Sequence, residues 1–366
     1  MNTVKVALFL PSLRGGGAER VMVNLAQGFA AQGLKVDLVL AKAEGPYLSQ
    51  VSPEVRVVDL KVSRVLACLP GLVRYLRQVR PQALLSAMDH ANIVALWARK
   101  LARVSTRIVV SVHSTPSMAT LHAKTLRGRL MPLWVRPFYP WADAIVAVSH
   151  GVAEDLIRFI GFPREKVQVI YNPVVTPELF AKAHEHLDHP WFVPGEPPVV
   201  LSVGRLTPAK DYPTLIKAFA LVCKERPARL MILGEGEERP TLEALIKELD
   251  LTQYIALPGF VENPYKYMKR AACFVLSSQW EGLPTVLIEA IALGVPVVAT
   301  DCPSGPREIL EGGRLGTLVP PGDVIELACA IQEVLSSNRS LPHMPNLELY
   351  TLENVIEKYL KILNHI

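Results

Sequence analysis

The chain has 366 residues, of which 50% are hydrophobic and 20% are charged, and its formal net charge is +5. This length exceeds what one hydrophobic core usually organises, and the composition excludes extended disorder, so we expect two globular domains. The five cysteines are scattered without a CxxC pair, which excludes a disulfide scaffold and a zinc finger and favours a reducing cytoplasm.

The first half alternates between strand-like runs and segments with helical spacing. This alternation predicts a parallel sheet with helices on both faces. The first run is a poor secretory leader, because it is short, contains Lys5 and leads directly into a glycine turn. Helices are expected from about Ala18, near 70–79 and near 91–103, between the runs VKVALFLP, VDLVLA, VRVVDL, ALLSA, RIVVSVH, AIVAVS and VQVIYNP.

Residues 176–198 interrupt this alternation with a proline-rich, polar stretch, which predicts a linker. The stretch contains His184, His186 and His189, but no cysteine or regularly spaced acid accompanies them. A solvated linker is therefore favoured over a metal site.

A second alternating series begins at PVVLSVGRL and continues to about residue 340. We therefore predict an α/β protein with two Rossmann-like, doubly wound domains that face a central cleft. The predicted domains are residues 1–175 and 199–340, and a C-terminal helix follows within 341–366.

Charge is divided unevenly between the two halves. Residues 1–180 hold 22 Lys and Arg against 11 Asp and Glu, so the first half is expected to face an acidic partner. Anionic lipid or a phosphorylated acceptor fits this charge, whereas nucleic acid is disfavoured because no RNA motif, zinc finger or basic helix is present. Residues 122–143 interleave cations with Leu, Phe and Trp, which is typical of a helix at a membrane surface and equally of a helix packed on the first sheet.

Two loops carry groups suited to an anionic ligand. In SLRGGGAERVMVNLA, residues 12–26, Gly16 and Gly17 stand between a strand and a helix, where a phosphate or a sugar hydroxyl would find free amides. An ordinary tight turn is the alternative. In VGRLTPAKD, Arg205 offers a planar fork and Lys210 a mobile charge, two complementary ways of neutralising a diphosphate. Solvated surface cations would have the same pattern.

Two carboxylates stand within the apolar run QWEGLPTVLIEAIALGVPVV. Glu281 is expected in a loop, and Glu289 inside a helix that begins near Pro284. Amides at such a helix start bind phosphate, and carboxylates accept hydrogen bonds from sugar hydroxyls. The arrangement therefore suits a sugar nucleotide, and a buried Glu289 satisfied by backbone partners is the alternative.

Together these motifs resemble the retaining glycosyltransferases of the GT-B fold, family 4. The resemblance rests on the E-x7-E element from Glu281 to Glu289, the GRLxPxKD stretch, the GGGAE turn and the VxVIxN strand with Asn172. GGGAERVMVNLA and CPSGPREIL are most similar to bacterial enzymes that build polysaccharides or lipid-linked glycans. One departure is Gly282-Leu283-Pro284, where many relatives have a glycine-aromatic-glycine run.

The resemblance implies that residues 1–175 bind the acceptor and that residues 199–340 bind the nucleotide-sugar. It also implies roles for individual residues. Arg205 and Lys210 would bind the donor diphosphate, Glu281 the transferred sugar and Glu289 the ribose. His113 would lie beside the reacting sugar, and a merely hydrogen-bonded strand-end histidine is the alternative. Further donor contacts would come from Gly16, Gly17, Gly259, Phe260, Val261, Gly282, Leu283, Pro284 and Thr285.

The implied activity is transfer of a hexose or N-acetylhexosamine, with retention of configuration, from a UDP-linked donor to a glycan or lipid-linked acceptor. Because Arg205 and Lys210 would neutralise the leaving diphosphate, we expect no metal and no cofactor. We expect a cytoplasmic enzyme at the inner face of the plasma membrane. Two other functions share the pattern: a UDP-N-acetylhexosamine epimerase of similar fold, and a catalytically silent subunit that binds a nucleotide-sugar.

Overall fold

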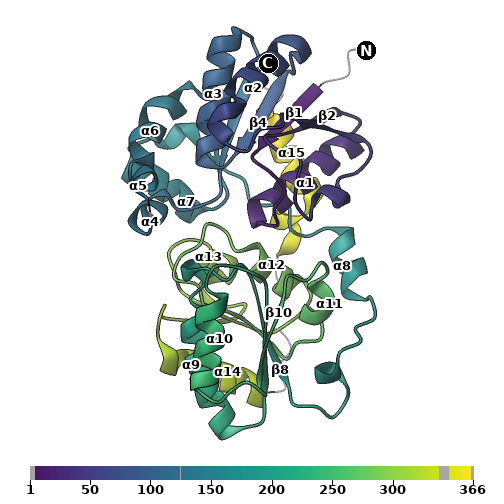
Figure 1. The fold of residues 1–366 in the computed structure, drawn as a ribbon, viewed down its shortest axis with the longest axis vertical. Helices are drawn as coiled ribbons and strands as arrows, with labels where there is room; N and C mark the ends of the chain where they lie inside the picture. The colour runs from purple at the N-terminus through teal and green to yellow at the C-terminus, as the bar shows by residue number, and fades with distance from the viewer. Residues whose placement is uncertain (1–4, 124, 338–345, 364–366) are drawn as a thin grey trace. The chain divides into compact units, whose positions relative to one another are not determined.

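The computed structural model describes residues 5–123, 125–337 and 346–363, which form two compact units (Figure 1). Unit 1 combines the chain up to Val174 with the chain from Glu348 onward, and unit 2 spans Val175–Leu347. Each unit contains one fully parallel sheet with helices, which confirms the predicted α/β class with two Rossmann-like sheets.

The sheet of unit 1 has seven strands in the order β3-β2-β1-β4-β5-β6-β7. Its strands read as almost continuous apolar runs because helices cover both faces, and every residue of β4 is buried. The strand order reverses between β1 and β4, where open α/β sheets bind ligands at the carboxyl ends of the strands. The strands are β1 (Lys5–Leu10), β2 (Lys35–Leu40), β3 (Val55–Asp59), β4 (Ala83–Ala87), β5 (Arg107–Val112), β6 (Ala144–Ala147) and β7 (Val167–Val169).

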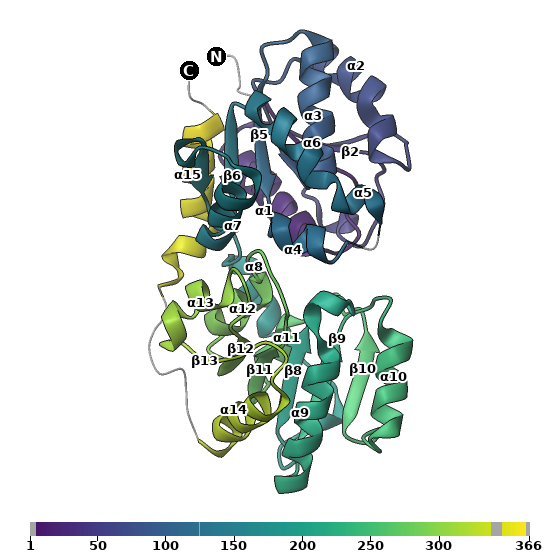
Figure 2. The ribbon, with the colours of Figure 1, turned by 90° about the vertical axis from the view of Figure 1, so that its left-hand side faces the viewer.

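Helices α1 and α15 lie side by side on one face of this sheet, and α2 and α3 cover the other (Figures 1 and 2). The C-terminal helix α15 packs closely because Gly28 of α1 has no side chain: a Cβ there would lie 2.7 Å from Ile356 Cδ1. Tyr359 then meets Phe29 edge to face, with ring centroids 6.4 Å apart. The helices are α1 (Gly17–Ala31), α2 (Leu69–Val79), α3 (Asp89–Ala102), α4 (Pro116–Leu121), α5 (Leu126–Arg129), α6 (Met131–Phe138), α7 (His150–Asp155) and α15 (Leu352–Leu363).

The sheet of unit 2 has six strands in the order β10-β9-β8-β11-β12-β13. Helices α9, α10 and α14 enclose the main hydrophobic core on one face, and α8 and α11 pack together on the other (Figures 1 and 2). The strands are β8 (Val199–Val203), β9 (Arg229–Leu233), β10 (Ile255–Gly259), β11 (Cys273–Leu276), β12 (Val297–Thr300) and β13 (Thr317–Val319). The helices are α8 (Pro177–Ala183), α9 (Tyr212–Glu225), α10 (Arg239–Glu248), α11 (Tyr265–Met268), α12 (Thr285–Ala292), α13 (Pro306–Ile309) and α14 (Val324–Ser336).

The stretch 176–198, which we expected to be a linker, is part of unit 2. Thr176 caps α8 by accepting the Leu179 amide at 3.2 Å, and Pro177 occupies the first helical position, where a missing N–H costs nothing. Asn263 binds the end of this helix by donating to the Lys182 carbonyl at 2.9 Å. Pro177 therefore starts a helix, and a proline-rich composition does not by itself distinguish a helix start from a linker.

The end of the second domain, expected at residue 340, lies outside the described residues. The C-terminal segment whose packing the sequence left open returns to unit 1 as α15. The chain leaves unit 1 after Val174 and re-enters it at Glu348. The Val174 amide donates to the Tyr350 carbonyl at 3.0 Å, so these two segments are hydrogen-bonded to each other.

Candidate active site

Lys210 is held at the carboxyl edge of the unit 2 sheet by a tight loop. After β8 the chain forms a 3-10 turn, Pro208–Lys210, that leads into α9. Asp211 adopts a left-handed conformation with φ 46°, and its carboxylate accepts the Thr214 amide at 3.4 Å. Because this N-cap fixes the start of α9, it also fixes the position from which the Lys210 side chain extends.

The loop after β11 is joined to the Lys210 loop. Ser277 Oγ donates to the Lys210 carbonyl at 2.7 Å, and the Gln279 amide donates to the Ala209 carbonyl at 2.8 Å. Strands β8 and β11 are neighbours in the sheet, so these bonds connect two loops at the same edge.

These loops bring Lys210 and Glu281 into direct contact. Lys210 Nζ lies 2.5 Å from Glu281 Oε1, and Ser278 Oγ donates to the same oxygen at 2.6 Å. The Lys210 and Glu281 side chains are 20% and 12% exposed, so the pair is shielded yet accessible. An ammonium group has three hydrogens, so Lys210 retains donors for phosphate while it contacts Glu281.

Glu289 lies in the second turn of α12 and is only 7% exposed. The loop before α12 is supported by the segment after β12, where Ser304 Oγ donates to the Gly282 carbonyl at 2.7 Å and Gly305, at φ 97°, packs against Pro284. The sequence offered no signal for the role of Ser304, because its hydrogen bond joins segments 22 residues apart.

Arg205 follows β8 but does not join the Lys210–Glu281 contact. It is exposed, and within the described part of the chain its guanidinium has no hydrogen-bond or ion-pair partner. Its backbone is nevertheless fixed: the Gly204 amide donates to the Leu233 carbonyl at 3.0 Å, and a Cβ on Gly234 would lie 1.9 Å from the Gly204 oxygen. Because the guanidinium has no partner among the described residues, all its N–H donors remain available to a ligand.

The predicted base-binding segment, Gly259, Phe260 and Val261, starts at the end of β10. The Gly259 carbonyl accepts the Gly234 amide at 2.8 Å, and the Phe260 side chain is 47% exposed. Sequence reasoning did not single out Glu235, whose Oε1 would lie 2.7 Å from a Cβ on Gly259 and whose carboxylate accepts two hydrogen bonds from Arg239 at 2.8 Å. Its only sequence signal was an acidic cluster, GEGEE, directly after a strand.

The glycine turn of unit 1 differs from an open anion site. Gly16 is the N-cap of α1 and Gly17 is its first residue. The Glu19 carboxylate lies over the turn, since a Cβ on Gly16 would be 2.2 Å from Glu19 Oε2. A second anion would be repelled there, so of the two predicted ligands the sugar hydroxyl is the more compatible with this turn.

His113 follows β5, with its Nε2 3.0 Å from Ser111 Oγ. Burial of the ring lowers the pKa of His113 to about 4. The imidazole is therefore neutral near pH 7 and forms hydrogen bonds without carrying charge.

The histidines of the proline-rich stretch have separate partners. His184 Nδ1 lies 2.8 Å from the Phe180 carbonyl oxygen, and His189 Nδ1 accepts the Trp191 amide at 3.2 Å. Among the described residues, no cluster of three or more His, Cys, Asp or Glu is arranged to hold a metal ion.

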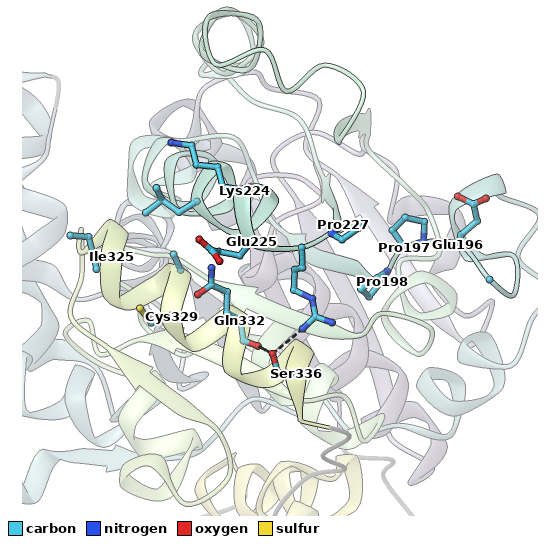
Figure 3. Close-up of a pocket in the computed structure, with 14 residues that line it drawn as sticks. Glu196, Pro197, Pro198, Lys224, Glu225, Pro227, Ile325, Cys329, Gln332 and Ser336 are labelled. Atoms are coloured by element: carbon cyan, nitrogen blue, oxygen red, sulfur yellow. Dashed lines mark hydrogen bonds between the residues drawn. The ribbon is translucent and has the colours of Figure 1, made fainter.

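Unit 2 also has a groove at the opposite, amino-terminal edge of its sheet (Figure 3). Pro197 and Pro198 line it just before β8, and Glu225, Cys329 and Gln332 contribute side chains from α9 and α14. The groove is therefore separate from the Lys210 and Glu281 loops, which follow the carboxyl ends of their strands.

Comparison with known proteins identifies the family. Residues 15–177 match the family described as Glycosyltransferase Family 4, and residues 185–347 match Glycosyl transferases group 1. A Campylobacter jejuni protein, N-acetylgalactosamine-N,N'-diacetylbacillosaminyl-diphospho-undecaprenol 4-alpha-N-acetylgalactosaminyltransferase, is 32% identical over 326 residues, with 86% of each chain covered. The chain belongs to the family 4 glycosyltransferases. A second C. jejuni enzyme, GalNAc-alpha-(1->4)-GalNAc-alpha-(1->3)-diNAcBac-PP-undecaprenol alpha-1,4-N-acetyl-D-galactosaminyltransferase, is 24% identical to this glycosyltransferase, with 98% of each chain covered.

Solved structures show that the glycosyltransferase has the GT-B fold. Anabaena HepE in complex with UDP and glucose has a TM-score of 0.78 at 21% identity, covering 99% of this chain and all of HepE. Sucrose-phosphate synthase from Thermosynechococcus elongatus has a TM-score of 0.82 at 20% identity, with 98% of each chain covered. The named relatives are transferases, so the comparisons support sugar transfer to a glycan or lipid-linked acceptor and give no support to the epimerase alternative.

Proposed function

We propose that this glycosyltransferase transfers a hexose or N-acetylhexosamine, with retention of configuration, from a UDP-sugar to a glycan linked to a lipid through a diphosphate. The contact of Lys210 with Glu281 carries this proposal, together with Arg205, which lies five residues before Lys210 and is unpaired among the described residues. It combines cations for a diphosphate with a carboxylate for a sugar. The names of both C. jejuni relatives specify diphospho-undecaprenol acceptors, and HepE was crystallised with UDP, which supports the two substrate classes.

Departure of the nucleoside diphosphate is the demanding step, because negative charge accumulates on phosphate as the glycosidic bond breaks. Arg205 would bind this charge with its planar fork, and Lys210 with the hydrogens that Glu281 does not use. Both backbones are fixed by hydrogen bonds, so little reorganisation is needed during the reaction. Since these cations supply the neutralising charge, the proposed reaction needs no divalent ion and no cofactor.

Retention would follow from attack on the face that the diphosphate leaves. The acceptor hydroxyl oxygen forms the new bond to the anomeric carbon as the bond to the phosphate oxygen breaks, and that phosphate oxygen takes the hydroxyl proton. Glu281 would hold the transferred sugar, Glu289 the ribose, and neutral His113 would contact the sugar without adding charge. The amides after Glu281, supported by Ser304, would complete the donor site.

A panel of nucleotide-sugars in a thermal-shift assay identifies the donor, since a bound ligand raises the melting temperature. We expect Arg205→Ala and Lys210→Ala to lower kcat ~100-fold or more without unfolding the protein. Lys224→Ala, in the groove at the opposite edge, is the matched control. Near-normal kcat in both site variants would refute the proposal. An inverted anomer in the product would refute retention, and activity lost in EDTA and restored by Mg²⁺ would refute metal independence.

We also propose that helices α4, α5 and α6 touch the inner leaflet of the plasma membrane. The segment 122–143, expected as one helix, forms several short helices, and α4 comes directly before it. Leucines project into solvent from these helices: Leu121, the last residue of α4, is 69% exposed, and Leu126 and Leu133 are 72% and 67% exposed. Lys124 and the Arg127 side chain lie outside the described residues, but Arg129 and Arg136 are exposed beside these leucines. Exposed leucine beside arginine favours an anionic lipid surface.

None of the described helices has the length and apolarity needed to cross a bilayer. Sedimentation with vesicles tests the proposed membrane contact. Wild-type protein should sediment with phosphatidylglycerol-containing vesicles at low salt, and Leu126→Ser combined with Leu133→Ser should reduce the bound fraction. Leu66→Ser, which alters a leucine 59% exposed elsewhere in unit 1, is the control. Equal binding by all variants would contradict the proposed surface.

A further inference from the structure

A carboxylate at the end of β4 has no role in the function proposed so far. Asp89 is partly buried, and Tyr139 Oη donates to its Oδ1 at 2.7 Å. Within the described residues its Oδ2 accepts no hydrogen bond, and no Lys or Arg forms an ion pair with it. Burial raises the pKa of Asp89, as expected for a carboxylate that is removed from water without a cation.

Asp89 is connected to the strand that carries His113. Asn92 Nδ2 donates to Tyr139 Oη at 2.9 Å and to the Ser111 carbonyl at 3.1 Å. Ala87 of β4 pairs in register with Ser111 of β5, and Asp89 and His113 each follow two residues later. Both side chains therefore extend from the same edge of the sheet, and the hydrogen bonds fix Asp89 relative to β5.

Three unfavourable features gather around this strand end. Met88 has a φ of 76°, which is strained for a residue with a side chain. Asn92 Oδ1 and Ser86 Oγ are fully buried, and neither has a hydrogen-bond partner among the described residues. Such costs are concentrated at functional sites, because a purely structural strand end would be expected to lose them.

The charge of the chain between Asp89 and Asp143 indicates the kind of ligand. No acidic residue occurs between Asp89 and Asp143, while eight Lys or Arg do. Of these cations, Arg129 and Arg136 are exposed, and Arg136 lies three residues before Tyr139. Exposed cations attract a diphosphate, whereas an oriented carboxylate accepts hydrogen bonds from vicinal sugar hydroxyls. A sugar joined to a diphosphate carries both groups.

We infer that Asp89 binds hydroxyl groups of the acceptor sugar, and that Tyr139 and Asn92 are positioning residues that aim its carboxylate. This inference rests on the proposed function and names a residue of its acceptor site in unit 1. Tyr139 occupies one carboxylate oxygen, which leaves Oδ2 as the acceptor for a sugar hydroxyl.

The test measures acceptor and donor kinetics separately for Asp89→Asn, which keeps the side-chain shape and removes the charge. The probes are a polyprenyl-diphosphate disaccharide ending in N-acetylgalactosamine and the UDP-sugar selected by thermal shift. We expect kcat/KM for the acceptor to fall ~10- to 100-fold, the effect of a hydrogen bond to a charged group, while the Kd of the UDP-sugar changes less than about twofold. Glu54→Gln, an exposed carboxylate before β3, is the control and should leave both values unchanged.

Tyr139→Phe tests positioning. It should raise the acceptor KM by less than Asp89→Asn does, and the double variant should be no worse than Asp89→Asn alone, because both changes remove one interaction. Acceptor kinetics within twofold of wild type in Asp89→Asn would overturn the inference, as would an equal loss of donor affinity. If wild-type protein binds no UDP-sugar, the proposed function fails together with this assignment, whereas an active wild type with an unaffected Asp89→Asn removes the assignment alone.

Discussion

Lys210 and Glu281 are 71 residues apart in the sequence, yet the Lys210 ammonium lies 2.5 Å from a Glu281 carboxylate oxygen. Two parallel strands, β8 and β11, are adjacent in the sheet, so the loops that follow them meet at its carboxyl edge. The contact is therefore a consequence of strand order, and it holds a cation and an anion ready for the two halves of a sugar nucleotide.

A double-mutant cycle measures this contact. We expect Glu281→Gln to lower the free energy of unfolding by ~1–2 kcal/mol, because Lys210 loses its partner in a shielded site. The Lys210→Met and Glu281→Gln changes should couple by ~1 kcal/mol in urea denaturation. The pair of Lys361 with Glu357, one helical turn apart in α15, has side chains 69% and 67% exposed; it is the control and should couple by less than ~0.5 kcal/mol. Equal coupling in the two pairs would contradict the shielding.

Gly305→Ala tests the support of the loop before α12. A Cβ on Gly305 would lie 2.4 Å from Pro284 Cδ, and the φ of 97° disfavours alanine. Gly313→Ala is the control. Gly313 has a similar φ, 106°, and no atom lies within 4 Å of a Cβ added there, so this variant has the same backbone strain without the steric clash. We expect both variants to lose stability and only Gly305→Ala to bind the UDP-sugar at least ~10-fold more weakly by calorimetry, since displaced amides no longer meet the phosphate. Equal affinities would show that the loop does not depend on this contact.

His113 should make stability depend on pH. Its pKa is about 4 in the folded protein, below the ordinary value of 6.5, so the unfolded chain binds an extra proton between these values. The free energy of unfolding should therefore decrease as pH falls from 6.5 to 4 and gain no further contribution from this residue below pH 4. Subtracting the pH profile of His113→Gln from that of wild type isolates the effect. A flat difference over this range would show that folding does not remove the ring from water.

Tyr359→Ala tests the placement of the C-terminal helix in unit 1. Tyr359 is 1% exposed and contacts Phe29, so truncation should lower the free energy of unfolding by ~3–5 kcal/mol. Lys358→Ala, the adjacent residue of α15, should change it by less than ~0.5 kcal/mol. A small effect at Tyr359 in denaturant titration would indicate that α15 does not belong to the core.

The loops of the candidate site were predictable because their chemistry is local. VGRLTPAKD and QWEGLPTVLIEA place cations and carboxylates directly after apolar strand runs, and parallel sheets bind ligands at that end. Asp89 has the same signal, an acid after the run ALLSA, but nothing in the sequence indicates that Tyr139 and Asn92 would orient it.

Taken by itself, the amino-acid sequence determined the elements and the class of fold. The spacing of apolar residues distinguishes buried strands from amphipathic helices, and glycine and proline mark the turns between them. Only the tertiary structure decided the partners: that Lys210 contacts Glu281 while Arg205 stays unpaired, that the proline-rich stretch joins unit 2, and that α15 returns to unit 1. These depend on contacts between residues far apart in the chain, whose free energy arises from packing and hydrogen bonding in three dimensions and leaves no local pattern.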